Sequence, residues 1–225
     1  PLCRTVEDAA LMLAALEDGK PADLTDASLS GVRLAVLLDQ PFNGIEDAPR
    51  SAFEMALDRL KEAGAVVDEI SVTAVGEATQ LAPTLFPAEA YATWRHLIDV
   101  DGDKMYGPVR TRFVQGRTIS AADFISGWRE LDCLRLVYRE AVAGYDAVIL
   151  PSCPILPPKR AALEADEAYF TERNLMALQN TRIGNLLGLA AVTLPTGTSS
   201  CGIMFQGENE ERLLRLAAAA EQALA

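Results

Sequence analysis

His96 is the only histidine of the chain, so a serine or cysteine hydrolase site with an imidazole base would have to use it. Asp99 and Asp101 follow it closely in "RHLIDVDGD", but no Gly-x-Ser-x-Gly nucleophile motif occurs in the sequence. One histidine and scattered carboxylates also give no recognisable metal-ligand spacing. The sequence therefore favours His96 as an ordinary helix residue, and it predicts neither a metal site nor a cofactor.

Cys153 is a second candidate nucleophile, because it stands at the end of an apolar run in "PSCP". A reactive thiol needs a basic neighbour that lowers its pKa, and none is close in the sequence. The other cysteines, Cys3, Cys133 and Cys201, are far apart and form no Cys-x-x-Cys pair, so neither a zinc cage nor a dense disulfide framework is indicated. Small buried thiols are the favoured interpretation.

The stretch "NTRIGN" contributes Asn180, Thr181 and Asn185, whose amide and hydroxyl groups can hydrogen-bond a ligand. The same groups can bond neighbouring backbone, and the glycines at 184 and 188 predict a junction between a helix and a strand that needs such partners. Residue chemistry alone favours the structural role and leaves ligand binding open.

These residues must be positioned by an alternation of strands and helices. Apolar runs rich in branched residues predict strands at residues 32–39, 66–72, 147–150, 190–197 and 201–207. Helical spacing of apolar residues predicts helices at 4–19, 46–65, 120–145, 166–182 and 209–225. Three of the expected helices have a polar N-cap residue: Thr5, Ser120 and Asn209.

The succession of elements predicts an α/β fold with helices on both faces of a sheet. Residues 1–225 are expected to form a single domain, in which the stretch from about 75 to 145 lacks strand patterns and is a helical insertion. The strand, helix and strand within 32–72 predict a parallel crossover unit.

Composition excludes several classes of protein. A net charge of −12 argues against direct nucleic-acid binding, which depends on Lys and Arg. No apolar run approaches the roughly 20 residues that span a bilayer, and "PLCRTVED" lacks the plan of a secretory signal, so the sequence predicts a cytoplasmic protein without membrane contact. Because the chain starts at Pro1 and enters a helix at once, we expect it to be the downstream part of a longer protein.

Several blocks resemble the amidase signature family, in that family's order. "PLCRTVEDAALMLAALEDG" resembles the helix that follows the family's catalytic region, and "RTRFVQGRTIS" with "YDAVILPSCPILPP" resembles its Arg, Gly, helix and Tyr-Asp-strand-Pro segment. "NTRIGNLLGLAAVTLPTG" and "CGIMFQGENEERLLRL" are similar to its closing blocks. Together these blocks reach both ends of the chain.

This resemblance implies a mixed β-sheet flanked by helices, and hydrolysis of a small-molecule amide by a Ser, cis-Ser, Lys triad without a cofactor. No Gly-Ser-rich nucleophile segment occurs, and the lysines lie outside the family's lysine context: Lys20, Lys61, Lys104 and Lys159. We therefore expect no catalytic residue in this chain, a triad upstream of Pro1, and no activity without that upstream half as partner. The sheet left open by its absence predicts a homodimer of the isolated chain.

The resemblance also implies where the substrate binds. Arg112, which precedes Gly116 as in the family, is a substrate-pocket candidate beside Asn180, Thr181 and Asn185. Residues 186–197 are expected to feed a central strand behind this pocket.

Two alternatives stay open. The A subunit of glutamyl-tRNA(Gln) amidotransferase belongs to the same family, but such subunits tend to carry an Asp where this chain reads "LMALQNT", which favours a stand-alone amidase. The second alternative is a non-catalytic binding or scaffold module that kept the fold and lost the triad, because a fold does not fix a function.

Overall fold

The computed structural model describes residues 1–225, and its centre is a five-stranded mixed sheet with the strand order β2-β1-β3-β5-β4. The strands are β1 (Arg33–Leu37), β2 (Val66–Ile70), β3 (Ala147–Pro151), β4 (Ala190–Pro195) and β5 (Gly202–Gly207). β1 is parallel to β2 and β3, whereas β5 is antiparallel to β3 and β4. The α/β class and the mixed, helix-flanked sheet are therefore as the sequence predicts.

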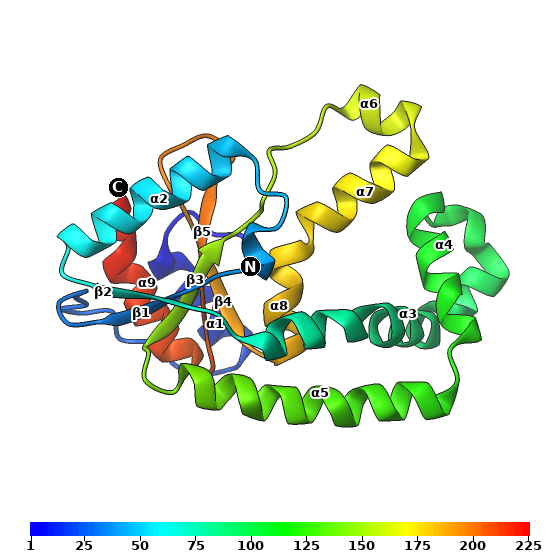
Figure 1. Cartoon of the computed structure of the whole chain (residues 1–225), viewed down its shortest axis with the longest axis horizontal. Coiled ribbons are helices and arrows are strands. Elements are labelled where there is room, and N and C mark those ends of the chain that lie inside the picture. Colours follow the sequence, from blue (N-terminus) through cyan, green and yellow to red (C-terminus); the bar gives the residue numbers. More distant parts are fainter.

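Helices cover both faces of the sheet (Figure 1). One face carries α1 (Val6–Leu16), α2 (Asp47–Glu62) and α9 (Glu210–Leu224), which share a core cluster with side chains of β1, β3, β4 and β5. The other face carries α3 (Thr73–Asp101), α5 (Ala121–Val142) and α8 (Gln179–Leu187). The strands β1, β3 and β5 alternate their side chains between the two clusters, which is why these short strands read as continuous apolar runs.

The three predicted N-caps are confirmed. The side chains of Thr5, Ser120 and Asn209 each accept the backbone N–H three residues further on, at 3.1, 3.0 and 2.8 Å, and these caps begin α1, α5 and α9. The parallel crossover β1-α2-β2 is confirmed as well. It turns back at Gly64, whose φ of +100° is a backbone conformation that favours glycine.

The residues between β2 and β3 are helical, as predicted. α3 is 29 residues long and contains Pro83 and Pro87, and it is followed by η2 (Gly102–Lys104), α4 (Gly107–Gln115), η3 (Gly116–Thr118) and α5. α3 and α5 extend together beyond the sheet, with α4 at their far end (Figure 1). No helix is both long enough and apolar enough to cross a membrane.

Gly116 allows the turn after α4 to lie against the backbone of α3. A Cβ at this position would lie 2.0 Å from the carbonyl oxygen of Pro87, and that atom cannot rotate away as a side chain could. We expect Gly116→Ala to lower the free energy of unfolding by about 3 kcal/mol, measured by urea titration of the helical circular dichroism. Gly76→Ala is the matched control, because a Cβ there meets nothing within 4 Å and should be neutral or stabilising. Equal stability of the two variants would contradict the close approach.

Two helices connect β3 to α8, and a short 3-10 helix lies beside this connection. η1 (Gln40–Phe42) follows β1, and α6 (Arg160–Ala165) and α7 (Glu167–Ala177) follow the proline-rich exit from β3. The exit is extended as its prolines predict, but α6 was not expected from the sequence.

The two edges of the sheet differ in chemistry. β2 carries Asp68 and Glu69, charges of the kind that protect an exposed edge from pairing, whereas β4 has no charged residue. The expectation that residues 186–197 feed a central strand is wrong for this chain, because β4 pairs only with β5 and forms an edge.

Candidate functional site

The four candidate pocket residues lie on α8 and α4, and the single helix predicted at 166–182 is divided at Leu178 into α7 and α8. The expected junction between helix and strand at Asn180, Thr181 and Asn185 is wrong, because the helix continues to Leu187 and ends at Gly188 with φ +69°. Gly184 does not form a loop but lies inside the helix, where a Cβ would be 3.1 Å from Nε2 of Gln206. The small residue lets α8 approach β5 closely.

Asn180 is the buried member of the set, with 0 % of its surface exposed. Its Nδ2 donates to the carbonyl oxygens of Pro41 in η1 and Pro151 at the end of β3, at 3.1 and 2.7 Å. Its Oδ1 is buried without a hydrogen-bond partner. Asn180 therefore ties the start of α8 to two segments that lie far away in the sequence, which is a positioning role.

Asn180→Ala should destabilise the fold because it leaves two buried carbonyl oxygens without their donor. We expect a loss of about 2–4 kcal/mol in the free energy of unfolding, measured by urea denaturation. Asn185→Ala is the matched control on the same helix, since Asn185 is exposed, and it should change stability by less than about 0.5 kcal/mol. A loss of similar size in both variants would show that the Asn180 bonds are not what matters.

Thr181 and Asn185 are exposed and stand four residues apart, so they share one face of α8. The Thr181 hydroxyl donates to the carbonyl oxygen of Leu178 at 3.3 Å, and the Asn185 side chain makes no hydrogen bond within the chain. The structure thus separates these two from Asn180: they are free to meet a ligand, and Asn180 is not.

Arg112 lies near a second arginine, Arg182, which no sequence motif indicated as a site residue. Its Nη1 donates to Oδ1 of Asn174 on α7 at 2.7 Å. Arg182 on α8 is partly buried; burial lowers the pKa of its guanidinium, and the positive charge of Arg112 lowers it further. Arg182 nevertheless remains a cation, because a guanidinium group is not deprotonated in proteins. No local sequence pattern predicts that the two arginines are neighbours, because they are far apart in the sequence and only the fold brings them together.

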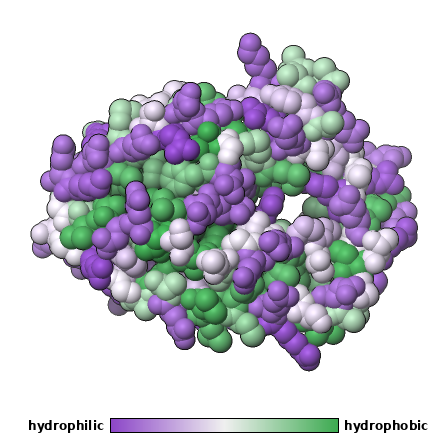
Figure 2. All heavy atoms as spheres, in the orientation of Figure 1, coloured by the Kyte–Doolittle hydropathy of each residue, from purple (hydrophilic) through white to green (hydrophobic).

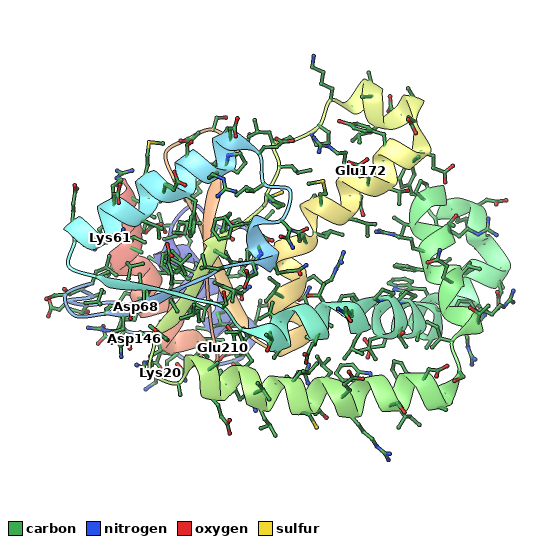
Figure 3. All side chains as sticks on the ribbon, viewed as in Figure 1. Lys20, Lys61, Asp68, Asp146, Glu172 and Glu210 are labelled. Atoms are coloured by element: carbon green, nitrogen blue, oxygen red, sulfur yellow. The ribbon has the colours of Figure 1, made fainter.

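Neither arginine has a carboxylate partner. None of the ion pairs of the chain includes Arg112 or Arg182. Glu172 is the labelled carboxylate on α7, while Asp68, Asp146 and Glu210 lie on the side of the sheet away from α4 and α7 (Figure 3). Two neighbouring cations without a counter-charge form a ready site for a carboxylate or another anion.

The arginines belong to the side of the molecule where α4 approaches α7. The Arg112 bond to Asn174 joins these helices, and so do the rings of Tyr106 and Phe170, whose centroids are 5.6 Å apart in an edge-to-face arrangement. Figure 2 shows an opening through the molecule in this region, between the sheet with its helices and α4. A small ligand can therefore reach this side of α8.

A second hollow, of about 600 Å³, lies where β3 ends and β4 turns into β5. Its lining includes Ser152, Thr193, Cys153 and Cys201, and the Ser152 hydroxyl donates to Oγ1 of Thr193 at 3.1 Å. No Lys, Arg or His lines it, so Cys153 has no basic partner there for the hydrolysis of an amide. His96 is exposed on α3.

The lysines are equally unsuited to a buried general base. All four are exposed: Lys20, Lys61, Lys104 and Lys159. Figure 3 shows Lys20 and Lys61 on the side of the sheet that is remote from α4 and α7. A lysine that is to accept a proton at neutral pH must be neutral, which burial achieves and full exposure does not.

A family model with the description "Amidase" matches residues 1–214 of this sequence. The chain belongs to the amidase family. Among the curated members, an amidase of Pseudomonas putida is 28% identical over 99% of this chain and 52% of its own length. The 2-amino-5-chloromuconic acid deaminase of Comamonas testosteroni is 27% identical over 96% of the chain and 49% of its own length.

Components of a larger amidase-family enzyme are similar as well. The A subunit of the glutamyl-tRNA(Gln) amidotransferase of Rubrobacter xylanophilus is 26% identical over 99% of the chain and 54% of its own length. A crystal structure of an amidase superimposes with a TM-score of 0.80 at 22% identity, over 99% of this chain and 52% of that one, which shows the shared fold. The chain thus spans about half the length of the amidase relatives that it matches.

Proposed function

We propose that this chain is the substrate-binding part of an amidase, which hydrolyses a linear amide to a carboxylic acid and ammonia or an amine. The observation that carries the proposal is that the chain matches about half of its amidase relatives while all of its lysines are exposed. In the proposal the Ser, cis-Ser, Lys triad belongs to the part of the protein upstream of Pro1.

The open edge of β4 supports a partner that continues the sheet. An uncharged edge strand exposes unpaired N–H and C=O groups that another strand can bond. Beside it lies a mainly apolar hollow of about 500 Å³, lined by Leu2, Val6, Ala9 and Leu13 of the N-terminal segment and by Val192 of β4. In the proposal the upstream half pairs with β4 and fills this hollow.

Each half then has a separate task in the reaction. The upstream lysine takes a proton through the bridging serine, the nucleophilic serine attacks the amide carbonyl, and ammonia or an amine leaves before water releases the acid. Arg112 and Arg182 hold a carboxylate elsewhere on the substrate, and Thr181 and Asn185 offer it hydrogen bonds. Orientation by groups remote from the reacting carbonyl lowers the entropic part of the barrier.

The arginine pair also suggests the substrate class. Two adjacent cations without counter-charge favour an amide that carries a carboxylate over a neutral one. One relative is by its name a deaminase of 2-amino-5-chloromuconic acid, a carboxylic acid. We therefore propose an acidic amide as the substrate.

The function is tested with the complete gene product and a panel of amides in matched acidic and neutral forms, with ammonia or amine release as the readout. We expect turnover, with the acidic member of each pair preferred. Absence of turnover on every amide would favour the non-catalytic binding module.

A second candidate function rests on the similarity to amidotransferase A subunits. An A subunit would release ammonia from glutamine and pass it to a partner that holds the acceptor. Glutamine hydrolysis that is stimulated by a co-purified partner, without turnover of other amides, would favour this role over the stand-alone amidase.

A further inference from the structure

Cys153 and Cys201 lie just beyond the paired ends of two antiparallel strands, β3 and β5. β3 and β5 pair with Pro151 opposite Ile203, and the ladder continues one step further, because the N–H of Ser152 donates to the carbonyl oxygen of Gly202 at 2.9 Å. The next step of this register places Cys153 opposite Cys201. Side chains that are directly opposite in an antiparallel pair lie on the same face of the sheet.

The backbone bonds of Cys201 show which kind of pair this is. Its N–H donates to the carbonyl oxygen of Thr198, and its own carbonyl oxygen accepts from Thr196, so both groups point to the β4 side. Cys201 is therefore not hydrogen-bonded to Cys153, and such pairs have the shorter Cα separation, about 4.5 Å. Disulfides form at Cα separations of about 4.4–6.8 Å, a range that includes the separation expected from the continued register.

Burial and charge agree with the close approach. Both cysteines line the hollow at the end of β3, with Cys153 partly exposed and Cys201 only 8% exposed. Burial raises the pKa of the Cys201 thiol, and the negative charge of a Cys153 thiolate raises it further. The remaining cysteines, Cys3 and Cys133, are exposed on the segment before α1 and on α5.

We propose that Cys153 and Cys201 form a redox-active thiol pair, which a peroxide converts into a disulfide that ties the β4–β5 turn to the end of β3. The sulfur of Cys153, the more accessible of the two, attacks first: an S–O bond forms, the O–O bond of hydrogen peroxide breaks, and the hydroxide that leaves takes up the thiol proton and becomes water. Cys201 then attacks the sulfenic sulfur of Cys153, the S–S bond forms, and the oxygen leaves as a second water. Each thiol loses one electron and its proton, and the peroxide gains two electrons.

The disulfide would fix a turn that the reduced chain holds only by a few hydrogen bonds. Gly197 and Ser200 within this turn have φ values of +85° and +62°. A non-glycine residue in this region costs about 1–3 kcal/mol, so the surrounding contacts must hold it. Because Pro151 beside the pair also accepts from Asn180 of α8, oxidation would stiffen the segment on which α8 rests.

The proposal is tested by peptide mapping of the complete protein after treatment with hydrogen peroxide and alkylation of the remaining thiols. Trypsin separates the relevant cysteines, because Cys133, Cys153 and Cys201 fall on the peptides 130–135, 140–159 and 183–212. We expect a product that joins peptides 140–159 and 183–212 and lacks two hydrogens, while Cys133 stays alkylatable.

Cys133→Ser is the matched control and should leave the joined product unchanged, since Cys133 is exposed on α5 and does not line the hollow that holds the pair. Cys153→Ser and Cys201→Ser should each abolish it. If Cys153 and Cys201 are still alkylated as fast as Cys133 after the peroxide treatment, the proposal is overturned. So would over-oxidation of Cys153 to sulfinic acid without any joined peptide, or the same yield of joined peptide from protein unfolded in guanidinium, because the pairing would then not depend on the fold.

Discussion

The isolated 225-residue chain is expected to hydrolyse amides at least about 10⁵-fold more slowly than the complete gene product, because its own side chains offer no paired nucleophile and base. The lysines are all exposed, His96 is exposed on α3, and Cys153 lies in a hollow without a basic residue. Loss of a whole nucleophilic triad costs about 10⁶ in turnover in well-studied hydrolases. The measurement is ammonia or amine release by both proteins at equal concentration.

The control for this comparison is the folded state of the isolated chain, checked by circular dichroism and by the size of the species in light scattering. Adding the separately produced upstream part should restore turnover if the two halves pair through β4. Turnover by the isolated chain at the rate of the complete protein would place the catalytic groups among its own residues and contradict the division of tasks.

Arg112→Ala and Arg182→Ala in the complete protein should each lower kcat/KM for an acidic amide by about 100-fold. Removing one partner of a charge-assisted contact costs about 2–5 kcal/mol, and 100-fold corresponds to about 2.7 kcal/mol. The loss should fall mainly on KM, since the carboxylate is remote from the reacting carbonyl and is bound equally in the ground and transition states. The neutral amide of the same length should change by less than about threefold.

Arg129→Ala is the matched control, because Arg129 is an exposed arginine of α5 that makes no ion pair. Arg112→Lys separates charge from geometry: it keeps the cation but loses the planar fork that contacts Asn174, so it should recover part of the selectivity. Equal losses on acidic and neutral amides would assign these arginines to the fold and not to substrate selection.

Local patterns predicted the elements well because their causes are local. The N-caps at Thr5, Ser120 and Asn209 each bond a backbone group only three residues away, and such spacing is visible in the sequence. The crossover β1-α2-β2 follows from chain connectivity, which restricts how two nearby strands can pair. The α/β class could therefore be stated in advance from these patterns, whereas the mixed sheet was implied by the family resemblance.

The arrangement of the candidate site could not be predicted, since it depends on contacts between distant residues. Asn180 was expected in a junction, but its donor bonds reach a proline 139 residues away in η1. Arg182 was not expected in the site because its neighbour Arg112 lies on another helix. The position of β4 at an edge was missed for the same reason: strand order is decided by pairing, and an apolar run reads alike in the middle and at the edge of a sheet.

The place of β5 in the sheet has a consequence for how the protein is made. β5 lies between β3 and β4, and α9 contributes eight of the 22 residues of the core cluster on its face. Both elements lie within the last 24 residues of this sequence. The ribosome synthesises β5 and α9 after the other elements of this sequence. The edge of β3 that pairs with β5 therefore stays unpaired while synthesis continues. The nascent protein is then exposed to misassembly from the synthesis of β3 until β5 and α9 have emerged, and chaperone demand should fall once they have.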